Sequence, residues 1–244
     1  MSKRVTIKDD VVIKDFSKGN RRFKKARFKK AKSLYRQLQK KEVHVPKAHA
    51  KDQKIIMEKL DKPVRSNAEQ KLAAEELLQL QFSDVKVKSP LYLRILDHPW
   101  VRTVYNLTHA LPVIGLRVYM RSMRILFQYA LFAPRLKKPI LIHNDYHKNN
   151  VFIEDDKPYI IDFESATRST RWILRDIVML AYDTSKEELN KLIVDYYLDL
   201  LQETYPQVEK KIDVKKELQV ALLCRHARKL HYRKQSRNVL FPEI

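Results

Sequence analysis

The chain has 244 residues and a formal net charge of +21, from 50 lysines and arginines against 29 aspartates and glutamates. This balance favours anionic partners: nucleotide phosphates, a phosphorylated glycolipid, an anionic membrane face or nucleic acid. With 44% hydrophobic residues the chain can bury a sizeable core, as one α/β domain of two lobes or as two small domains.

Two residue counts exclude particular kinds of site. The single cysteine excludes an internal disulfide and a cysteine zinc site. Only two glycines are present, whereas the phosphate loops of the Walker and Rossmann types need several so that the backbone can approach the phosphates. A nucleotide site in this chain must therefore be built without a glycine-rich loop.

The start of the chain leads directly into alternating apolar and charged residues, so we expect no signal peptide. The longest apolar region, residues 110–133, contains three arginines, which argues against a membrane-spanning helix. We expect a cytoplasmic protein, with the inner face of the membrane as a further location.

Residues 5–16 predict a short hairpin, because apolar positions flank a turn at Asp9 and Asp10 and the second strand ends in Lys14. Residues 21–41 predict a helix with one apolar face and a densely basic remainder. Three interpretations of that basic face stay open: a solvated surface, a site for anionic lipid or a glycolipid phosphate, and a site for nucleic acid.

Residues 43–60 predict a strand, a turn and a second strand. Residues 66–81 predict a helix, since Ser66 or Asn67 can cap it and Glu69 completes a capping-box pattern. Two prolines interrupt residues 83–99, which we expect to be irregular.

Residues 116–131 predict an amphipathic helix on which Arg117, Arg121 and Arg124 share one face. This cationic stripe is a candidate contact for a phosphorylated acceptor or for an anionic membrane surface. The alternative is a helix of the core whose exposed side is basic.

Residues 141–166, LIHNDYHKNNVFIEDDKPYIIDFESA, predict a strand, a polar loop and a hairpin. Asp145, Asn150 and Asp162 lie at the ends of these strands, so the hairpin can bring them into one small volume. Two carboxylates and an amide oxygen are hard donors of the kind that Mg²⁺ with a polyphosphate requires. The stretch therefore indicates metal–nucleotide chemistry.

The spacing His143-x-Asp145-x4-Asn150, followed by Asp162-Phe163-Glu164, resembles the catalytic and metal-binding loops of the kinase fold. It is most similar to the small-molecule branch: aminoglycoside phosphotransferases, choline-kinase-like enzymes and lipopolysaccharide kinases of the Kdo and heptose types. The implied fold is α+β and bilobal, protein-kinase-like, with a reduced β-rich N-lobe in residues 1–62 and a mainly helical C-lobe in residues 63–244.

The resemblance implies roles for individual residues. Asp145 would accept or orient the proton of the acceptor hydroxyl, and Asn150 and Asp162 would hold Mg²⁺ against the phosphates of ATP. Lys14 would bind the α- and β-phosphates, with Lys8 as the alternate. The backbone groups of Glu58 and Leu60, in a hinge near residues 58–65, would bind adenine.

Four further residues would support this site. His143 would brace the catalytic loop, and His147 would lie on the acceptor side or behind the loop. Glu164 replaces the glycine of protein kinases, which indicates a constitutive enzyme without a flipping loop. Asp176 would hold the backbone of the catalytic loop rigid.

One departure concerns the glutamate that pairs with the phosphate-binding lysine in kinases. No acidic residue lies between Asp15 and Glu42, and Ala31 or Lys32 stands where that glutamate would be expected. Either Lys14 is poorly positioned or another carboxylate takes over.

The function implied is transfer of a phosphoryl group from ATP to a hydroxyl of a small molecule or glycolipid sugar. The charge of the chain favours an anionic acceptor, and hence a lipopolysaccharide-type or other sugar kinase, over a cationic aminoglycoside. Two other classes stay open: a catalytically weak kinase fold that serves as a binding module, and a basic protein associated with nucleic acid.

Overall fold

The computed structural model describes residues 5–17, 21–183 and 188–232. Its N-terminal part is built on a four-stranded antiparallel sheet with the order β1-β2-β4-β3. The strands are β1 (Val5–Lys8), β2 (Val11–Asp15), β3 (Ala48–Lys51) and β4 (Lys54–Glu58). The expected N-terminal hairpin is therefore present, with Lys14 on its second strand.

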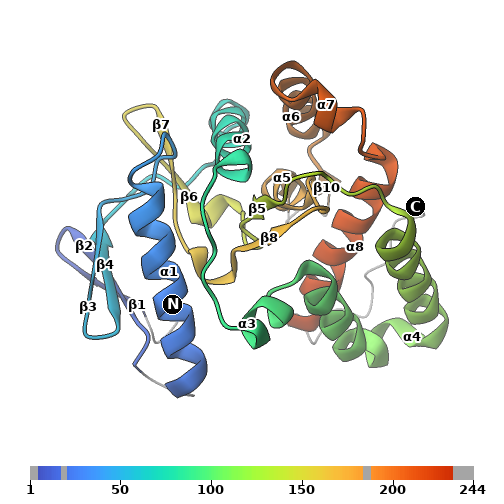
Figure 1. Ribbon diagram of the computed structural model, residues 1–244, viewed down its shortest axis with the longest axis horizontal. Helices are drawn as coiled ribbons and strands as arrows, with labels where there is room; N and C mark the ends of the chain where they lie inside the picture. Colours follow the sequence, from blue (N-terminus) through green and yellow to red (C-terminus); the bar gives the residue numbers. More distant parts are fainter. Residues whose placement is uncertain (1–4, 18–20, 184–187, 233–244) are drawn as a thin grey trace.

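Helix α1 (Arg21–Leu38) lies beside this sheet (Figure 1). Its apolar face is the one expected from the sequence, since Ala31, Leu34, Tyr35 and Leu38 are buried in the core. The helix contacts β3 and β4 on one side and the segment after β7 on the other. It thereby links the sheet to the segment that contains Phe163 and Glu164.

The remainder of the described chain is mainly helical and occupies the other side of the molecule (Figure 1). Its helices are α2 (Asn67–Phe82), α3 (Leu91–Leu96), α4 (Pro99–Phe132), α5 (Arg175–Ala181), α6 (Lys191–Thr204), α7 (Pro206–Glu209) and α8 (Val214–Tyr232). Helices α4 and α8 pack extensively on each other. The fold is thus α+β, with a small β-rich N-terminal part and a helical C-terminal part, as expected.

Short strand pairs lie among these helices, and the first two of them frame the motif of residues 141–166. They are β5 (Ile140–Ile142) with β8 (Thr167–Ser169), β6 (Val151–Glu154) with β7 (Lys157–Ile160), and β9 (Tyr182–Asp183) with β10 (Glu188–Leu189). Two single 3-10 turns, η1 (Lys148–Asn150) and η2 (Phe163–Ser165), lie within the motif.

The connection between the two parts is held by backbone hydrogen bonds. The N–H of Ile153 donates to the carbonyl of Lys62, and the N–H of Val64 donates to the carbonyl of Val151, at 2.8 and 3.0 Å. The connection therefore forms a short extra edge on β6. We propose that the N-lobe and the C-lobe divide here, near residue 62.

The expected start of α2 is confirmed. Ser66 caps the helix by accepting a hydrogen bond from the N–H of Glu69, while the Glu69 side chain accepts from the N–H of Ser66. This reciprocal pair satisfies two N–H groups that a helix end otherwise leaves without partners.

One local expectation is wrong: residues 83–99 are not irregular throughout, because they contain α3 and the start of α4. Pro90 directly precedes α3, and Pro99 is the first residue of α4, where a proline lacks only an N–H that would have no helical partner. The helix expected over residues 116–131 is present as the part of α4 that follows Gly115. Residues 43–60 contain the expected strand, turn and second strand, with the first strand beginning at Ala48.

Helix α4 is bent at Gly115, whose φ of 76° and ψ of 162° lie outside the helical region. A residue with a Cβ rarely adopts this positive φ, so glycine is what permits the bend. None of the helices in the described ranges is long and apolar enough to span a membrane.

Candidate active site

The β6–β7 hairpin brings Asn150 and Asp162 to the same end of two paired strands. Val151 pairs with Ile160 in this hairpin, and the N–H of Ile161 donates to the carbonyl of Asn150 at 3.0 Å. Asn150 therefore immediately precedes one strand where Asp162 follows the other. The juxtaposition expected from the sequence is a direct result of the hairpin register.

Lys14 reaches this point from the N-terminal sheet. Its Nζ lies 2.8 Å from Oδ2 of Asp162 and 2.5 Å from Oε1 of Glu164. Burial lowers the pKa of Lys14, but the two carboxylates outweigh this, and the pKa stays above its ordinary value. Lys8, the alternate, is exposed and pairs with Val11 near the turn of the hairpin. The structure thus brings Lys14, and not Lys8, to the motif.

Glu164 takes the position that the missing helix glutamate leaves open. Besides Lys14, it contacts Arg27 of α1, with 3.5 Å between Oε2 and Nη1. The carboxylate beside the lysine therefore comes from the metal-binding loop, and α1 contributes a cation. A carboxylate that does not come from α1 is thus paired with Lys14.

A second ion pair ties α1 to the helical part. Nζ of Lys30 lies 2.5 Å from Oδ2 of Asp97, and both side chains are almost fully buried. Lys30 also donates to the carbonyl of Ala166 at 3.1 Å, and Arg27 contacts Asp97 at 3.2 Å. Burial lowers the pKa of Lys30 below its ordinary value, an effect that Asp97 opposes.

The loop between β5 and η1 is held from behind by Asp176. This fully buried carboxylate accepts hydrogen bonds from the N–H groups of His143 and Asn144, at 2.7 and 3.0 Å. Burial raises the pKa of Asp176, and the hydrogen bonds from the backbone of His143 and Asn144 oppose the rise. The contact expected for Asp176 is present in the structure.

Asn144 fixes the backbone between the two motif residues. It adopts a φ of 67°, a left-handed conformation that asparagine tolerates better than most residues. Its amide nitrogen donates to the carbonyls of Asp97 and Ser165 at 3.0 and 2.9 Å. Asn144 therefore joins the catalytic loop to the end of α3 and to the end of η2.

His143 is buried and touches the metal-binding loop rather than the solvent. Its Nε2 lies 2.8 Å from the carbonyl of Ile161, so that nitrogen is the donor, and its ring meets Phe163 edge to face. Such a histidine braces the loop and is not placed for proton transfer to a substrate.

Asp162 also has a left-handed backbone, with a φ of 66°. Its N–H donates to the hydroxyl of Tyr35 at 3.1 Å, and the Tyr35 ring packs edge to face on Phe163. A backbone conformation of this kind is held only where its surroundings enforce it. Tyr35 and Phe163 provide that enforcement and fix the direction of the Asp162 carboxylate.

Asp145 follows Asn144 directly and is only partly exposed. Its Oδ1 lies 2.6 Å from Nη1 of Arg228, on α8, and 3.3 Å from Nε2 of His147. Burial raises the pKa of Asp145, but the contact with His147 and the charge of Arg228 outweigh it and bring the pKa well below its usual range. Asp145 is therefore a carboxylate at neutral pH.

Asn150 is oriented by its amide nitrogen, which donates to the carbonyl of Asp145 at 2.8 Å. Because the nitrogen is used in this hydrogen bond, the amide oxygen of Asn150 is available as an uncharged ligand for a metal ion. Asn150 and Asp162 thus offer a hard oxygen pair that fits Mg²⁺ when phosphate oxygens and water complete the shell. Within the described residues, no group of three or more His, Cys, Asp or Glu side chains forms a metal site by itself.

Glu58 and Leu60, the residues expected to bind adenine, lie at the end of β4 and just after it. The N–H of Glu58 donates to the carbonyl of Lys47, and its side chain accepts from the N–H of Lys47 at 2.9 Å. Leu60 follows in the connection toward residue 62. Arg117, Arg121 and Arg124 lie on α4, away from the motif residues in the chain, and none of them contributes to the cavity beside Asp145.

A cavity of about 330 Å³ opens beside Asp145. It is lined by His147, Lys148, Asn149, Met179, Tyr182, Asp183, Arg225 and Arg228. Because Arg228 also contacts Asp145, the cavity reaches the residue expected to act on the acceptor. Its basic side chains make it a suitable place for an anionic group.

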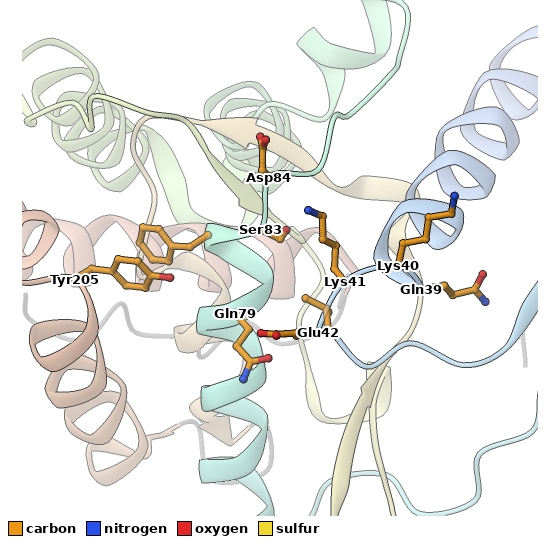
Figure 2. A pocket seen from close by; sticks show the side chains of 10 residues that line it. Gln39, Lys40, Lys41, Glu42, Gln79, Ser83, Asp84 and Tyr205 are labelled. Carbon is orange, nitrogen blue, oxygen red and sulfur yellow. The ribbon is translucent and has the colours of Figure 1, made fainter.

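A larger cavity of about 780 Å³ lies elsewhere, between the end of α1 and the end of α2 (Figure 2). Lys40, Lys41, Glu42 and Asp84 line it, so its charges are mixed. None of the motif residues contributes to it. It is therefore not part of the candidate active site.

The profile of the phosphotransferase enzyme family matches residues 3–210. Among solved structures, choline kinase LicA from Streptococcus pneumoniae is similar with a TM-score of 0.58 and 15% identity, over 97% of this chain and 84% of that one. An ADP-bound aminoglycoside phosphotransferase, APH(2'')-Ib, is similar with a TM-score of 0.55 and 17% identity, over 94% of this chain and 91% of that one. An ethanolamine kinase from Plasmodium vivax is similar with a TM-score of 0.57 and 16% identity, over 90% of this chain and 69% of that one. No curated protein sequence matches the chain.

The chain belongs to the phosphotransferase enzyme family. It is a small-molecule kinase, an enzyme that transfers a phosphoryl group to a hydroxyl, and kinases of this kind use ATP with Mg²⁺. The family resemblance of residues 141–166 is confirmed.

Several residues of the site carry no signal in the sequence. Arg27, Lys30 and Arg228 are three among 50 basic residues, and Asp97 lies in a segment expected to be irregular. Asn144 could have been noticed, because an asparagine between the two motif residues is well suited to a left-handed turn.

Proposed function

We propose that the protein phosphorylates a hydroxyl of an anionic sugar or glycolipid, as a lipopolysaccharide-type or other sugar kinase, at the inner face of an anionic membrane. One observation carries the phosphoryl transfer: Lys14, Asp162 and Glu164 converge from two parts of the chain beside the loop that bears Asp145. In this arrangement a cation and hard oxygen donors meet next to an ionised carboxylate.

The nucleotide would be held by residues of both parts. Lys14 would bind the α- and β-phosphates, and Asn150 and Asp162 would bind Mg²⁺, which when present neutralises charge on the phosphates. The backbone groups of Glu58 and Leu60 would bind adenine, with the hinge at residues 58–65. Glu164 would keep Lys14 extended toward the phosphates.

Asp145 would orient the acceptor hydroxyl. Because its pKa is low, Asp145 is a weak base and takes the proton only as the bond to phosphorus forms. This suits phosphoryl transfer, in which the transition state is loose and the nucleophile needs positioning more than early deprotonation. His147, 3.3 Å away, would share in holding the carboxylate.

The charges around Asp145 support an anionic acceptor. Arg225 and Arg228 line the adjoining cavity, and Arg102 interacts electrostatically with Arg175, Arg228 and Asp145. Burial lowers the pKa of Arg102 to about 10, with a further contribution from the neighbouring arginines Arg175 and Arg228. An anionic group on the acceptor would compete for Arg228 and release Asp145 for the hydroxyl.

A thermal-shift titration with ATP and Mg²⁺ tests the nucleotide site. Nucleotide at about a hundred times its Kd stabilises a protein by about 2.7 kcal/mol, which raises the Tm of a chain this size by about 5–10 °C. Asp162→Asn keeps the left-handed backbone, because asparagine tolerates it, and should lose the Mg²⁺-dependent part of the shift.

The matched control is Asp156→Asn, at the turn of the same hairpin, which also has a positive φ but lies at the opposite end from the site. It should retain the full shift. A wild-type protein without any Mg²⁺-dependent shift would overturn the proposed nucleotide site.

The acceptor class is tested by turnover assays with phosphorylated sugars, Kdo- and heptose-containing glycolipids, choline and an aminoglycoside. We expect turnover with an anionic sugar, and a raised KM for it in Arg228→Gln. Turnover with the aminoglycoside alone would refute the anionic acceptor while leaving the kinase reaction intact.

The nucleic-acid interpretation has a separate test. Binding to single-stranded or duplex nucleic acid with a steep dependence on salt would support it. We expect only weak binding of this kind.

A further inference from the structure

Helix α4 exposes apolar side chains that the fold leaves uncovered. After the bend at Gly115, large apolar residues stand on its outer side, several of them at intervals of three and four residues. Their exposed fractions are 66% for Leu116, 58% for Met120, 49% for Phe127, 68% for Leu131 and 74% for Phe132. We call these five residues, together with Arg117, Arg121 and Arg124, the α4 face.

All the charged side chains of the α4 face are positive. Its three arginines lie among the apolar residues, and Arg135, Lys137 and Lys138 follow just beyond the helix. Residues 98–144 contain no aspartate or glutamate. The charged side chains that α4 and the residues after it contribute are therefore all positive, and the carboxylate of Glu217, which α8 brings to Tyr129 of α4, is buried.

We propose that the α4 face docks the protein on an anionic lipid bilayer, with the apolar side chains in the acyl boundary and the arginines among the headgroups. A helix that joins an apolar side to arginines is the form taken by helices that lie in a membrane interface. Contiguous exposed apolar surface on a soluble chain generally marks such an interaction site.

Two other occupants fit the α4 face less well. A two-fold contact with a second copy would set the arginines of one face against those of the other, because such an interface pairs a surface with itself. Nucleic acid would meet the charge, but leucine and methionine side chains offer no flat ring on which a base can stack. A bilayer with anionic lipid satisfies both the charge and the apolar residues.

The docking deepens the proposed function and rests on it in one respect. A kinase held on the bilayer by α4 would meet an acceptor that is itself anchored there, such as a glycolipid sugar. Binding to the bilayer does not depend on the nucleotide site, so the two proposals can fail separately.

The test is co-sedimentation of the full chain with vesicles of phosphatidylcholine, with and without about a third of phosphatidylglycerol. Wild type should bind the anionic vesicles and not the neutral ones. Each arginine near an anionic surface strengthens binding about fivefold, so Arg117→Gln/Arg121→Gln/Arg124→Gln should bind about a hundredfold more weakly. Leu116→Gln/Met120→Gln/Leu131→Gln should lose at least about tenfold.

A matched control removes the same charge from another helix. Lys29, Lys32 and Arg36 lie on the basic side of α1, and their replacement by glutamine should leave vesicle binding within a few-fold of wild type. An equal loss in this control would overturn the proposal, because binding would then follow net charge and not the α4 face.

A fluorescence measurement reports insertion directly. An environment-sensitive dye on Met120→Cys should shift to the blue with anionic vesicles, whereas the dye on Leu192→Cys, which is 51% exposed on α6, should not. Equal shifts at both positions would refute insertion of α4.

Two further readouts distinguish docking from self-association and from loss of folding. Sedimentation velocity without vesicles should show a monomer, and a dimer that the Leu116, Met120 and Leu131 triple variant disrupts would assign the face to a second copy. All variants should keep the Mg²⁺-dependent thermal shift with ATP, which shows that they are folded. Vesicle binding without that shift in wild type would uphold docking and refute only the nucleotide site.

Discussion

Asp97→Asn removes the charge that compensates Lys30 and leaves the rest of the contact almost unchanged in shape. The side chains of Lys30 and Asp97 are 1% and 2% exposed, so water cannot replace the lost carboxylate. The carbonyl of Ala166 still accepts from Lys30, but it cannot balance a full charge. The lysine must either stay charged without a partner or give up its proton.

The cost of giving up the proton sets the size of the effect. Lysine in the unfolded chain has a pKa of about 10.4, so a neutral Lys30 at pH 7 costs about 4.6 kcal/mol at about 1.36 kcal/mol per pH unit. Breaking one side of a buried ion pair costs about 3–5 kcal/mol in other proteins. We therefore expect Asp97→Asn to lower the free energy of unfolding by about 4 kcal/mol at pH 7.

The loss in free energy of unfolding caused by Asp97→Asn should become smaller as the pH rises. In the variant the unfolded chain binds one proton more than the folded chain between the depressed pKa of Lys30 and its unfolded value, so stability rises with pH across that window. At pH 9 the same calculation leaves a cost of about 2 kcal/mol. In wild type Asp97 opposes the depression, so its stability should change less over this range.

Urea unfolding at pH 7 and pH 9 measures these quantities. Adding Lys30→Met to Asp97→Asn should restore much of the stability, since the fully buried charge of Lys30 is then absent and Arg27 keeps its contact with Glu164. Lys29→Met, a neighbour on α1 that is not buried, is the control and should change little. A loss below about 1 kcal/mol, an equal loss at both pH values, or no recovery in the double variant would refute the reasoning.

Three further predictions concern the site and its support. Glu164→Gln should raise the KM for ATP several-fold in a steady-state assay, because Lys14 keeps one of its two carboxylates; an unchanged KM would mean that Glu164 does not position the lysine. Asp176→Asn should lower the free energy of unfolding by about 1–3 kcal/mol through weaker hydrogen bonds to the catalytic loop, and should also lower kcat, whereas the exposed Asp199→Asn should do neither. Ser66→Ala should cost about 1 kcal/mol in urea unfolding with no change in KM, and a change in KM would show that the cap reaches the site.

Most of the local structure can be predicted from the sequence, because it depends on residues that are neighbours along the chain. The turn at Asp9 and Asp10 and the capping box at Ser66 follow from local rules. The prolines at residues 90 and 99 misled for a local reason as well: proline starts a helix as readily as it ends one. The extent of α4 could not be predicted, since its bend at Gly115 interrupts the apolar pattern.

The residues of the candidate site also fall into two groups, those whose proximity follows from local sequence and those whose contacts depend on packing. Asn150 and Asp162 are joined by one hairpin, so their proximity could be predicted. The pairs Lys30–Asp97 and Arg228–Asp145 depend on how distant helices pack, and nothing in the local sequence distinguishes these cations from the many others. The replacement of the missing glutamate by Glu164 could be anticipated only as the need for some carboxylate.

The hairpin that carries Asn150 and Asp162 also bears on the order in which the chain folds. Contacts close in sequence form with little loss of chain entropy, whereas the contact of Lys14 with Asp162 must wait for two distant segments of the chain to meet. Asn150 and Asp162, which we propose to hold Mg²⁺, can thus meet as soon as the hairpin forms, and Lys14 joins them only after the N-terminal sheet has docked. Affinity for the phosphates of a nucleotide is therefore a measure of whether the two parts of the chain have come together.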